Sequence, residues 1–136
     1  MKIEMINIKT INTEGMGELS FFEELKDIEF EIKRIYFITK VRRGVRRGGH
    51  AHKELKQLLF CPYGKILIKL NDGYEEREIV LDCPEKGLIV ENRIWREMLW
   101  LEDESVLCVA ANSYYNPDDY IRDYEEYIKT IEKGEV

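Results

Sequence analysis

The stretch GVRRGGHAHKELKQLLFCPYG, which runs from Gly44 to Gly64, contains the only two histidines of the chain, placed one residue apart. Side chains two residues apart on a β-strand point to the same face, so His50 and His52 would lie side by side while Ala51 faces away. An imidazole with an ordinary pKa of about 6.5 can take and give protons near neutral pH, and it can also bind metals. The stretch therefore indicates either a metal site or an acid–base pair in one cavity.

The segments around this stretch read as short β-strands separated by turns. Seven segments are rich in β-branched, aromatic or leucine residues, namely residues 34–40, 57–61, 65–70, 77–81, 87–91, 97–102 and 105–110. Turn signals separate several of them, at Pro62-Tyr63-Gly64, at Asn71-Asp72-Gly73 and between Pro84 and Gly87. Regularly spaced short strands predict an all-β sandwich or barrel, here as a single domain over residues 1–136.

A helix is predicted at the end of the chain. Asn116 can cap it, Pro117 suits its first position, and the acidic pair Asp118-Asp119 suits the positive end of the helix dipole. Apolar residues then recur at helical spacing, at Tyr120, Ile121, Tyr124, Tyr127, Ile128 and Ile131. We expect a β-barrel with one C-terminal α-helix, and disorder only in the last few residues.

Composition excludes several classes of function. The 136 residues carry a formal net charge of −6, which argues against general nucleic-acid or membrane-surface binding, since both need a broad positive field. No apolar run approaches the roughly 20 residues of a membrane span, and the first residues, MKIEMINIK, do not form the apolar core of a secretory signal. The three cysteines form no C-x-x-C pair and indicate neither a disulfide framework nor a zinc site. We expect a cytoplasmic protein.

The spacing of the histidine stretch resembles the first motif of the cupin β-barrels, G-x5-H-x-H-x4-E-x6-G. The chain matches this pattern except at Gln57, which replaces the glutamate, and it lacks the further histidine of the second cupin motif. Two imidazoles without a third nitrogen or a carboxylate make a weak site for a divalent transition metal. We therefore expect a cupin-type jelly-roll barrel without a bound metal, whose histidines act as acid and base. Structural histidines near a strand end are the alternative.

The approach to the histidines is strongly basic, through Lys40, Arg42, Arg43, Arg46 and Arg47. The planar guanidinium fork suits the oxygens of phosphate groups. If these arginines lie close to the imidazoles, they disfavour the charged form and keep a histidine able to act as a base. The alternative is a solvated basic loop that binds nothing.

Several motifs jointly resemble one family. RGGHAHK, QLLFCPYG, GLIVENRIWREM and NSYYNPDDYIRDYEEY are similar to stretches of the nucleotide-sugar 3,4-ketoisomerases of the cupin superfamily, which act on dTDP-4-keto-6-deoxyglucose, and the likeness runs from about Lys33 to Tyr127. The resemblance implies a metal-free homodimer, without a cofactor, that moves the keto group from C4 to C3 of the sugar. It also implies that the product feeds an aminotransferase in the synthesis of surface polysaccharide such as lipopolysaccharide.

The resemblance implies a role for each histidine: His50 removes the C3 proton, and His52 moves a proton between the two sugar oxygens. An enediolate also needs hydrogen-bond donors at its oxyanion, so we assign a catalytic hydroxyl to Tyr36, with core packing as the alternative. The remaining predicted substrate contacts are Arg34, Arg47, Lys53, Gln57, Arg96, Tyr115 and Arg122. Arginines among them suit the diphosphate, although Arg122 could instead form a pair on the terminal helix.

Two positions depart from the family pattern. Glu14-Gly15 stands where the family has an Arg-Gly pair, and Arg96 stands where histidine often follows the tryptophan. Both positions bear on the shape of the sugar pocket, and so on the C4 configuration of the product, galacto or gluco. Arg96 would add a positive donor.

Three other functions remain as alternatives. A nucleotide-sugar 3,5-epimerase would use the same kind of base, a non-catalytic sugar-nucleotide-binding cupin would use the arginines alone, and a metal-dependent cupin oxygenase would need ligands that the sequence lacks. Carbonyl migration needs a proton shuttle between oxygens and epimerisation does not. The tandem histidines therefore favour the ketoisomerase.

Overall fold

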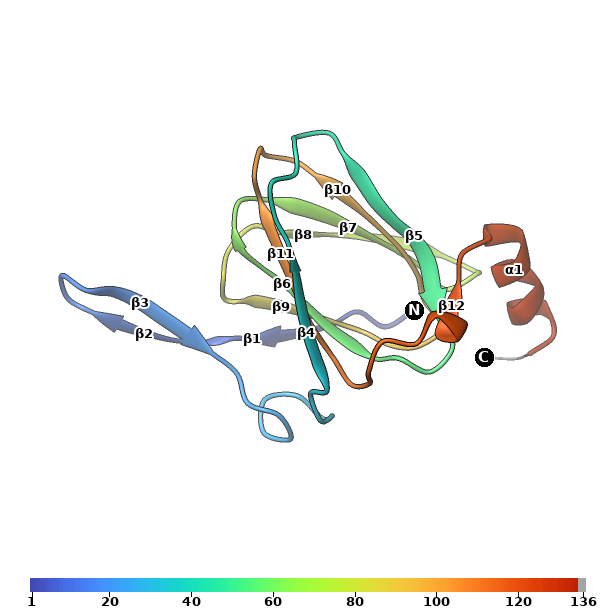
Figure 1. Cartoon of the computed structure of the whole chain (residues 1–136), viewed down its shortest axis with the longest axis horizontal. Helices are drawn as coiled ribbons and strands as arrows, with labels where there is room; N and C mark the ends of the chain where they lie inside the picture. Colours follow the sequence, from blue (N-terminus) through green and yellow to red (C-terminus); the bar gives the residue numbers. More distant parts are fainter. Residues whose placement is uncertain (135–136) are drawn as a thin grey trace.

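The structure, a computed structural model, describes residues 1–134 and contains two five-stranded antiparallel sheets that face each other (Figure 1). One sheet has the strand order β1-β9-β6-β11-β4 and the other the order β12-β5-β10-β7-β8. The disorder expected at the very end of the chain concerns residues outside the described range. The predicted cupin-type barrel with a C-terminal helix is confirmed.

The strands of the first sheet are β1 (Glu4–Asn7), β4 (Arg34–Ile38), β6 (Gln57–Tyr63), β9 (Lys86–Val90) and β11 (Val106–Ala111). Those of the second are β5 (Arg46–His52), β7 (Ile66–Asn71), β8 (Glu76–Leu81), β10 (Trp95–Trp100) and β12 (Tyr120–Ile121). All seven segments predicted from composition form strands, with ends shifted by one or two residues. The histidine stretch forms β5, whereas β1 and β12 were not predicted.

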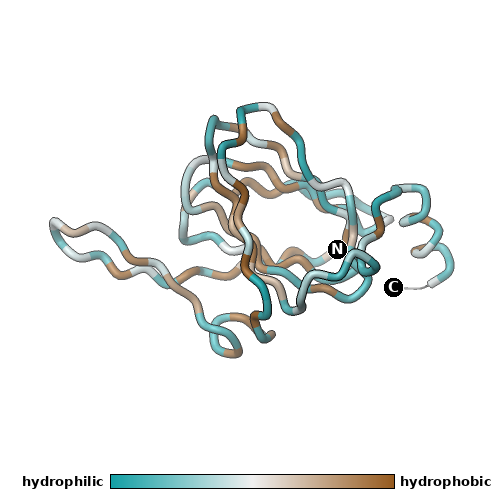
Figure 2. Tube along the Cα trace, viewed as in Figure 1, coloured by the Kyte–Doolittle hydropathy of each residue, from teal (hydrophilic) through white to brown (hydrophobic). Residues whose placement is uncertain are grey.

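Alternating side chains fill the space between the two sheets. In β7, Ile66, Ile68 and Leu70 are buried while the residues between them are partly exposed, which is the pattern of a strand with one face on a core. Trp100 is completely buried in the same core, and its Nε1 donates to the carbonyl of Ser105 at 2.7 Å. Figure 2 shows hydrophobic stretches along the strands of both sheets.

A two-stranded hairpin, β2 (Lys9–Thr13) and β3 (Gly17–Phe21), projects away from the barrel (Figure 1). It belongs to neither of the large sheets. Gly15 lies in its turn with a φ of 74°, a left-handed conformation that glycine adopts without strain. The sequence analysis did not predict this hairpin.

The predicted C-terminal helix begins later than expected. Asn116 caps a separate 3-10 turn, Pro117–Asp119, and the chain then becomes extended in β12 because Tyr120 and Ile121 pair with His52 and Ala51 of β5. The helix α1 spans Tyr124–Glu132 and is capped by the side chain of Asp123. The predicted cap at Asn116 and start at Pro117 are found in the short 3-10 helix, but the expected continuation through Tyr120 and Ile121 was wrong, since pairing with β5 overrides a local helix signal. Among residues 1–134, no helix has the length and apolar character needed to cross a membrane.

Helix α1 covers the outer side of β5. Its buried Tyr127 and Ile131 form a small core with Ala51, Trp95 and Ile121. The Tyr127 hydroxyl donates to the carbonyls of Asn71 and Arg93. The helix thus holds the histidine strand from the side opposite the histidines.

Candidate active site

His50 and His52 lie side by side at the end of β5. Their ring centroids are 4.9 Å apart with the ring planes nearly perpendicular, while Ala51 between them faces the helix α1. The ring of Tyr120 from β12 completes the group, with its centroid 4.3 Å from that of His52 and 5.1 Å from that of His50. Strand alternation therefore places the two imidazoles on one face, as the sequence indicated.

A cavity of about 570 Å³ adjoins this group of rings. Six of the predicted site residues line it, namely Arg34, Tyr36, Arg47, His50, Tyr115 and Arg122. Gly48 lies in its wall with a φ of 88°, where a Cβ would come within 2.9 Å of the Arg96 carbonyl oxygen. A residue with a side chain would therefore push β5 and β10 apart at the edge of the cavity.

The three arginines of the cavity have no carboxylate partners within the described part of the chain. The guanidinium carbon of Arg34 lies 5.5 Å from the ring centroids of Tyr36 and of Tyr115, and that of Arg122 lies 4.2 Å from the centroid of Tyr120. Stacking on aromatic faces holds a guanidinium group while leaving its N–H donors available. The cavity therefore suits an anionic ligand.

The basic residues that precede the histidines do not all lie at the cavity. Arg47 lines the cavity, whereas Arg42, Arg43 and Arg46 are exposed and do not line it. Arg43 lies in the turn before β5, where its backbone N–H donates to Asp103. Successive side chains of a strand face opposite sides, so Arg46 and Arg47 cannot both face the cavity.

Burial keeps both imidazoles neutral at physiological pH. Loss of hydration, together with the positive charges of Arg96 and Arg122, lowers the pKa of His50 to about 4. For His52 the same two causes, burial first and then Arg96, lower the pKa to about 2. The cations that act on the histidines are therefore Arg96, Arg122 and, for His52, Arg34, rather than the basic residues that immediately precede the histidines in the sequence, which corrects the sequence-based expectation.

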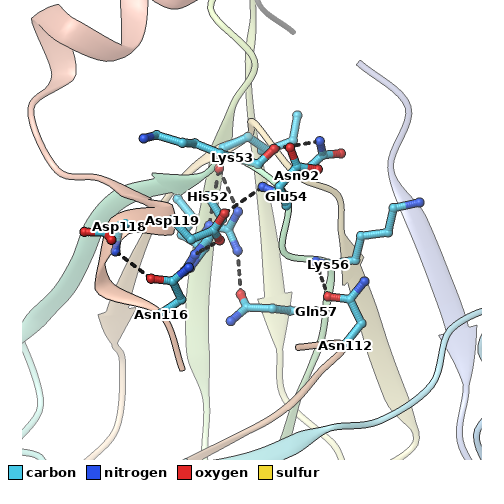
Figure 3. Close-up of polar contacts among 12 residues, drawn as sticks. His52, Lys53, Glu54, Lys56, Gln57, Asn92, Asn112, Asn116, Asp118 and Asp119 are labelled. Carbon is cyan, nitrogen blue, oxygen red and sulfur yellow. Dashed lines mark hydrogen bonds and ion pairs between the residues drawn. The ribbon is translucent and has the colours of Figure 1, made fainter. Parts of the chain in front are cut away.

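Asp119 orients the ring of His52 (Figure 3). The Nδ1 of His52 lies 3.1 Å from the Asp119 carboxylate, whose other oxygen accepts from the backbone N–H of Glu54 at 2.9 Å. The carboxylate by itself favours a charged ring, but the 1% exposed imidazole also faces Arg96, and the neutral form prevails. A neutral ring that donates from Nδ1 carries its free lone pair on Nε2, which is buried and has no protein partner within residues 1–134.

Three predicted substrate contacts do not line the cavity. Lys53 is exposed at the end of β5, and its backbone groups bond to Asp119 and Asn92. Gln57 and Arg96 are each 1% exposed and lie in the barrel interior. Arg96 donates to the Gln57 side-chain oxygen, and Gln57 Nε2 donates to the Tyr36 hydroxyl at 3.2 Å. Gln57 and Arg96 therefore reach the cavity through Tyr36.

Residues of the site that the sequence analysis missed are Ile38, Gly48, Met98, Asp119 and Tyr120. The signals for Asp119 and Tyr120 were present, as a member of the acidic pair and as the first apolar residue at helical spacing, but both were attributed to a helix. In residues 1–134, no group of three or more His, Cys, Asp or Glu side chains is arranged to hold a metal ion.

The two facing sheets and the C-terminal helix place the chain among the proteins with a cupin-type barrel. A family described as "FdtA: WxcM-like, C-terminal" matches residues 1–132, and the chain belongs to this family of sugar 3,4-ketoisomerases. It is an isomerase.

Named relatives agree with this assignment. The chain is 41% identical over 133 residues to the TDP-4-oxo-6-deoxy-alpha-D-glucose-3,4-oxoisomerase of Aneurinibacillus thermoaerophilus, covering 98% of this chain and 95% of the relative. A 3,4-ketoisomerase from Helicobacter canadensis superposes with a TM-score of 0.92 at 40% identity, covering 97% and 98% of the two chains. The sugar 3,4-ketoisomerase QdtA of Thermoanaerobacterium thermosaccharolyticum, solved with TDP, has a TM-score of 0.92 at 41% identity, covering 97% and 96%.

Proposed function

We propose that this chain converts dTDP-4-keto-6-deoxyglucose into a dTDP-3-keto-6-deoxyhexose. The observation that carries the proposal is the pair of neutral imidazoles, 4.9 Å apart, beside a cavity lined by three arginines without carboxylate partners. A relative that acts on this 4-keto sugar and a relative solved with TDP support the choice of substrate.

The reaction relocates an oxidation level within one sugar and needs no external oxidant or reductant. His50, which lines the cavity, removes the C3 proton, and the electron pair of the C–H bond becomes the C3–C4 double bond of an enediolate with its negative charge on the C4 oxygen. A proton then moves from the C3 oxygen to the C4 oxygen, and protonated His50 delivers a proton to C4 and returns to its neutral form. The product carries its carbonyl at C3.

His52 is the proposed shuttle between the two oxygens. Its Nδ1 is engaged by Asp119, whereas its Nε2 has no protein partner within the described chain and is free to exchange a proton. The ring lies behind His50 and Tyr120 rather than in the cavity wall, so the shuttle operates where these rings meet. Tyr36 supplies a hydroxyl to the sugar.

The nucleotide part of the substrate accounts for the other predicted site residues that line the cavity. Arg34, Arg47 and Arg122 provide charge-assisted hydrogen bonds to the diphosphate oxygens. Tyr115 offers an aromatic face for the thymine ring. The negative charge of the substrate thereby replaces the missing carboxylate partners.

We further infer that the protein is a homodimer, as the family resemblance implies. β4 is an edge strand, and its Ile35 and Phe37 are 61% and 66% exposed. The projecting hairpin exposes Ile11, Met16 and Leu19. Apolar side chains gathered on an open edge and a projecting arm favour association with a second copy. In the cell, the 3-keto product would supply an aminotransferase of surface-polysaccharide synthesis in the cytoplasm.

One incubation tests the function. The protein is mixed with dTDP-4-keto-6-deoxyglucose, and the position of the carbonyl is followed by NMR, which also reports the C4 configuration of the product. Migration to C3 is the expected result. Unchanged substrate would exclude the enzyme and favour a sugar-nucleotide-binding cupin, and inversion at C3 or C5 without migration would identify a 3,5-epimerase.

A further inference from the structure

Three polar side chains, two of them buried, form a connected series of hydrogen bonds across the barrel interior. Arg96 on β10 in one sheet donates to the side-chain oxygen of Gln57 on β6 in the other, and Gln57 Nε2 lies 3.2 Å from the hydroxyl of Tyr36 on β4. Arg96 and Gln57 are each 1% exposed, and Tyr36 lies in the cavity wall. Burying polar groups costs free energy even when they are bonded to one another, so their presence in the barrel interior needs an explanation.

The chemistry of the three side chains fixes which atom donates and which accepts in each of the two hydrogen bonds. A guanidinium group only donates, so the atom of Gln57 that faces Arg96 must be Oε1, and the carbonyl of Ile94 holds Arg96 from the other side at 2.9 Å. Gln57 Nε2 is then the atom that faces Tyr36. An amide N–H only donates, so the Tyr36 hydroxyl accepts this bond and its own proton points elsewhere.

The proton of the Tyr36 hydroxyl is left to point into the cavity. Within residues 1–134 the Tyr36 hydroxyl has no hydrogen-bond partner besides Gln57, and the side chain borders the cavity. Burial raises the pKa of Tyr36, so the phenol keeps its proton at neutral pH.

We propose that Arg96 and Gln57 form a one-way hydrogen-bond relay that holds the Tyr36 hydroxyl as a donor aimed into the cavity, at the sugar oxygen that becomes negative in the enediolate. Tyr36 touches the substrate, and Gln57 is a positioning residue that acts through it. The inference rests on the proposed function. It gives the amide at position 57, where the cupin motif carries a carboxylate, a reason in the chemistry of the reaction.

The substitution Gln57→Glu reverses the relay with almost no change of shape. A carboxylate only accepts, so Glu would bind Arg96 with one oxygen and accept from the Tyr36 hydroxyl with the other. The Tyr36 proton would then point away from the sugar. A stabilising donor would be lost although no atom that touches the substrate has been removed.

The first test compares turnover in four variants. We expect Gln57→Glu to lower kcat as much as Tyr36→Phe, by about 10²–10³, the usual loss on removal of one oxyanion donor, with the affinity for free dTDP unchanged. The double variant should lose no more than either single one, because both remove the same interaction. The matched control is Asn112→Asp, which makes the same amide-to-acid change next to the same strand pair, where its side-chain oxygen accepts from the backbone N–H of Lys56 (Figure 3).

Gln57→Met provides a second variant if the Glu protein does not fold. It removes the amide without adding an acceptor, so the Tyr36 proton can still turn into the cavity and kcat should fall less than in Tyr36→Phe. A Gln57→Glu protein with the kcat of Asn112→Asp would overturn the relay, and so would a folded Tyr36→Phe protein with full activity.

The second test does not depend on turnover. In the His50→Asn background the sugar ketone, labelled with carbon-13 at C4, should persist in the site, and a donor at its oxygen lowers the carbonyl stretching frequency in the infrared. We expect this lowering to disappear when Tyr36→Phe or Gln57→Glu is added and to remain with Asn112→Asp. If the wild-type chain binds the sugar without moving its carbonyl, the proposed function fails while this comparison still decides the relay. A frequency unchanged by Gln57→Glu would refute the relay alone.

Discussion

The barrel interior and the β2–β3 hairpin depart from ordinary burial in opposite directions. The interior holds His52, Gln57 and Arg96, three polar side chains that are almost fully buried, whereas the hairpin exposes Met16 and Leu19, two large apolar ones. Polar groups are buried at a cost, and exposed apolar groups forgo the gain of burial. Each departure therefore marks a place where stability alone does not explain the residues: the first fits chemistry on a substrate, and the second fits contact with a second copy.

The largest effect expected from the interior is at the base. His50→Asn should abolish turnover and also the exchange of the C3 hydrogen with deuterated solvent, because no other neutral imidazole lines the described cavity wall. His52→Asn should lower turnover while some C3 exchange persists, since an enediolate can still form and return. NMR of the sugar in deuterium oxide measures both. Rapid exchange in the His50 variant would show that another group is the base.

Asp119→Asn should produce the next largest loss. An amide at this position can donate to Nδ1, which would move the His52 proton to Nε2 and block the proposed shuttle. The loss of kcat should approach that of His52→Asn, and nitrogen-15 NMR of the imidazole should show the change of tautomer. The matched control is Asp118→Asn, because Asp118 is exposed and its side chain does not contact His52. A drop in kcat with an unchanged tautomer would remove the orienting role from Asp119.

The two arginines of β5 allow a comparison between a residue that lines the cavity and a neighbour that does not. Arg47→Ala should weaken binding of free dTDP by about tenfold to a hundredfold, the loss of roughly 1.5–3 kcal/mol expected for a charge-assisted hydrogen bond. Arg46→Ala removes the same charge from a neighbouring exposed position outside the cavity and should leave affinity nearly unchanged. Calorimetric titration measures both variants. Equal losses would mean that only the general positive field matters.

The exposed apolar residues of the hairpin and of β4 are predicted to form a contact between two copies of the protein. Phe37→Glu on the edge strand β4 and Leu19→Glu on the hairpin should shift the protein from dimer toward monomer, because each would place a charge in an apolar contact. Light scattering after size-exclusion chromatography measures the mass. Tyr74→Glu, at an exposed position in the turn between β7 and β8, is the control and should leave the mass unchanged. A wild-type protein that is monomeric at high concentration would contradict the dimer.

The last comparison concerns the effect of pH on stability. The folded-state pKa values of about 4 and about 2 lie below the ordinary value of the unfolded chain, so the unfolded state binds more protons between pH 6.5 and these values. Stability should therefore be independent of the histidines above pH 6.5 and fall as the pH drops, by up to about 1.4 kcal/mol per pH unit for each histidine. Melting temperatures of wild type and His52→Asn across this range measure it, and the variant should show the shallower decline. Parallel declines would indicate that His52 titrates normally in the fold.

The sequence predicted those parts of the fold that depend on short-range patterns. Apolar residues and turn signals located seven strands, and the two-residue period placed His50 and His52 on one face. The family resemblance, carried by the motifs around these residues, led to an isomerase, and the match to the family confirms it. The hairpin β2–β3 escaped prediction because its strands carry few of the residues that mark a buried strand.

Only the tertiary structure decided which residues meet at the site. Tyr120 and Asp119 reach the histidines because β12 pairs with β5, a contact between segments 67 residues apart that no local period encodes. The same holds for Arg96 and Gln57, which two facing sheets bring together. Local propensity even pointed the wrong way at Tyr120 and Ile121, since hydrogen bonds to a distant strand outweigh a preference shared by a few neighbouring residues. Composition and spacing thus determined the fold class and the histidine pair, while long-range pairing and burial determined their partners, their charge and their orientation.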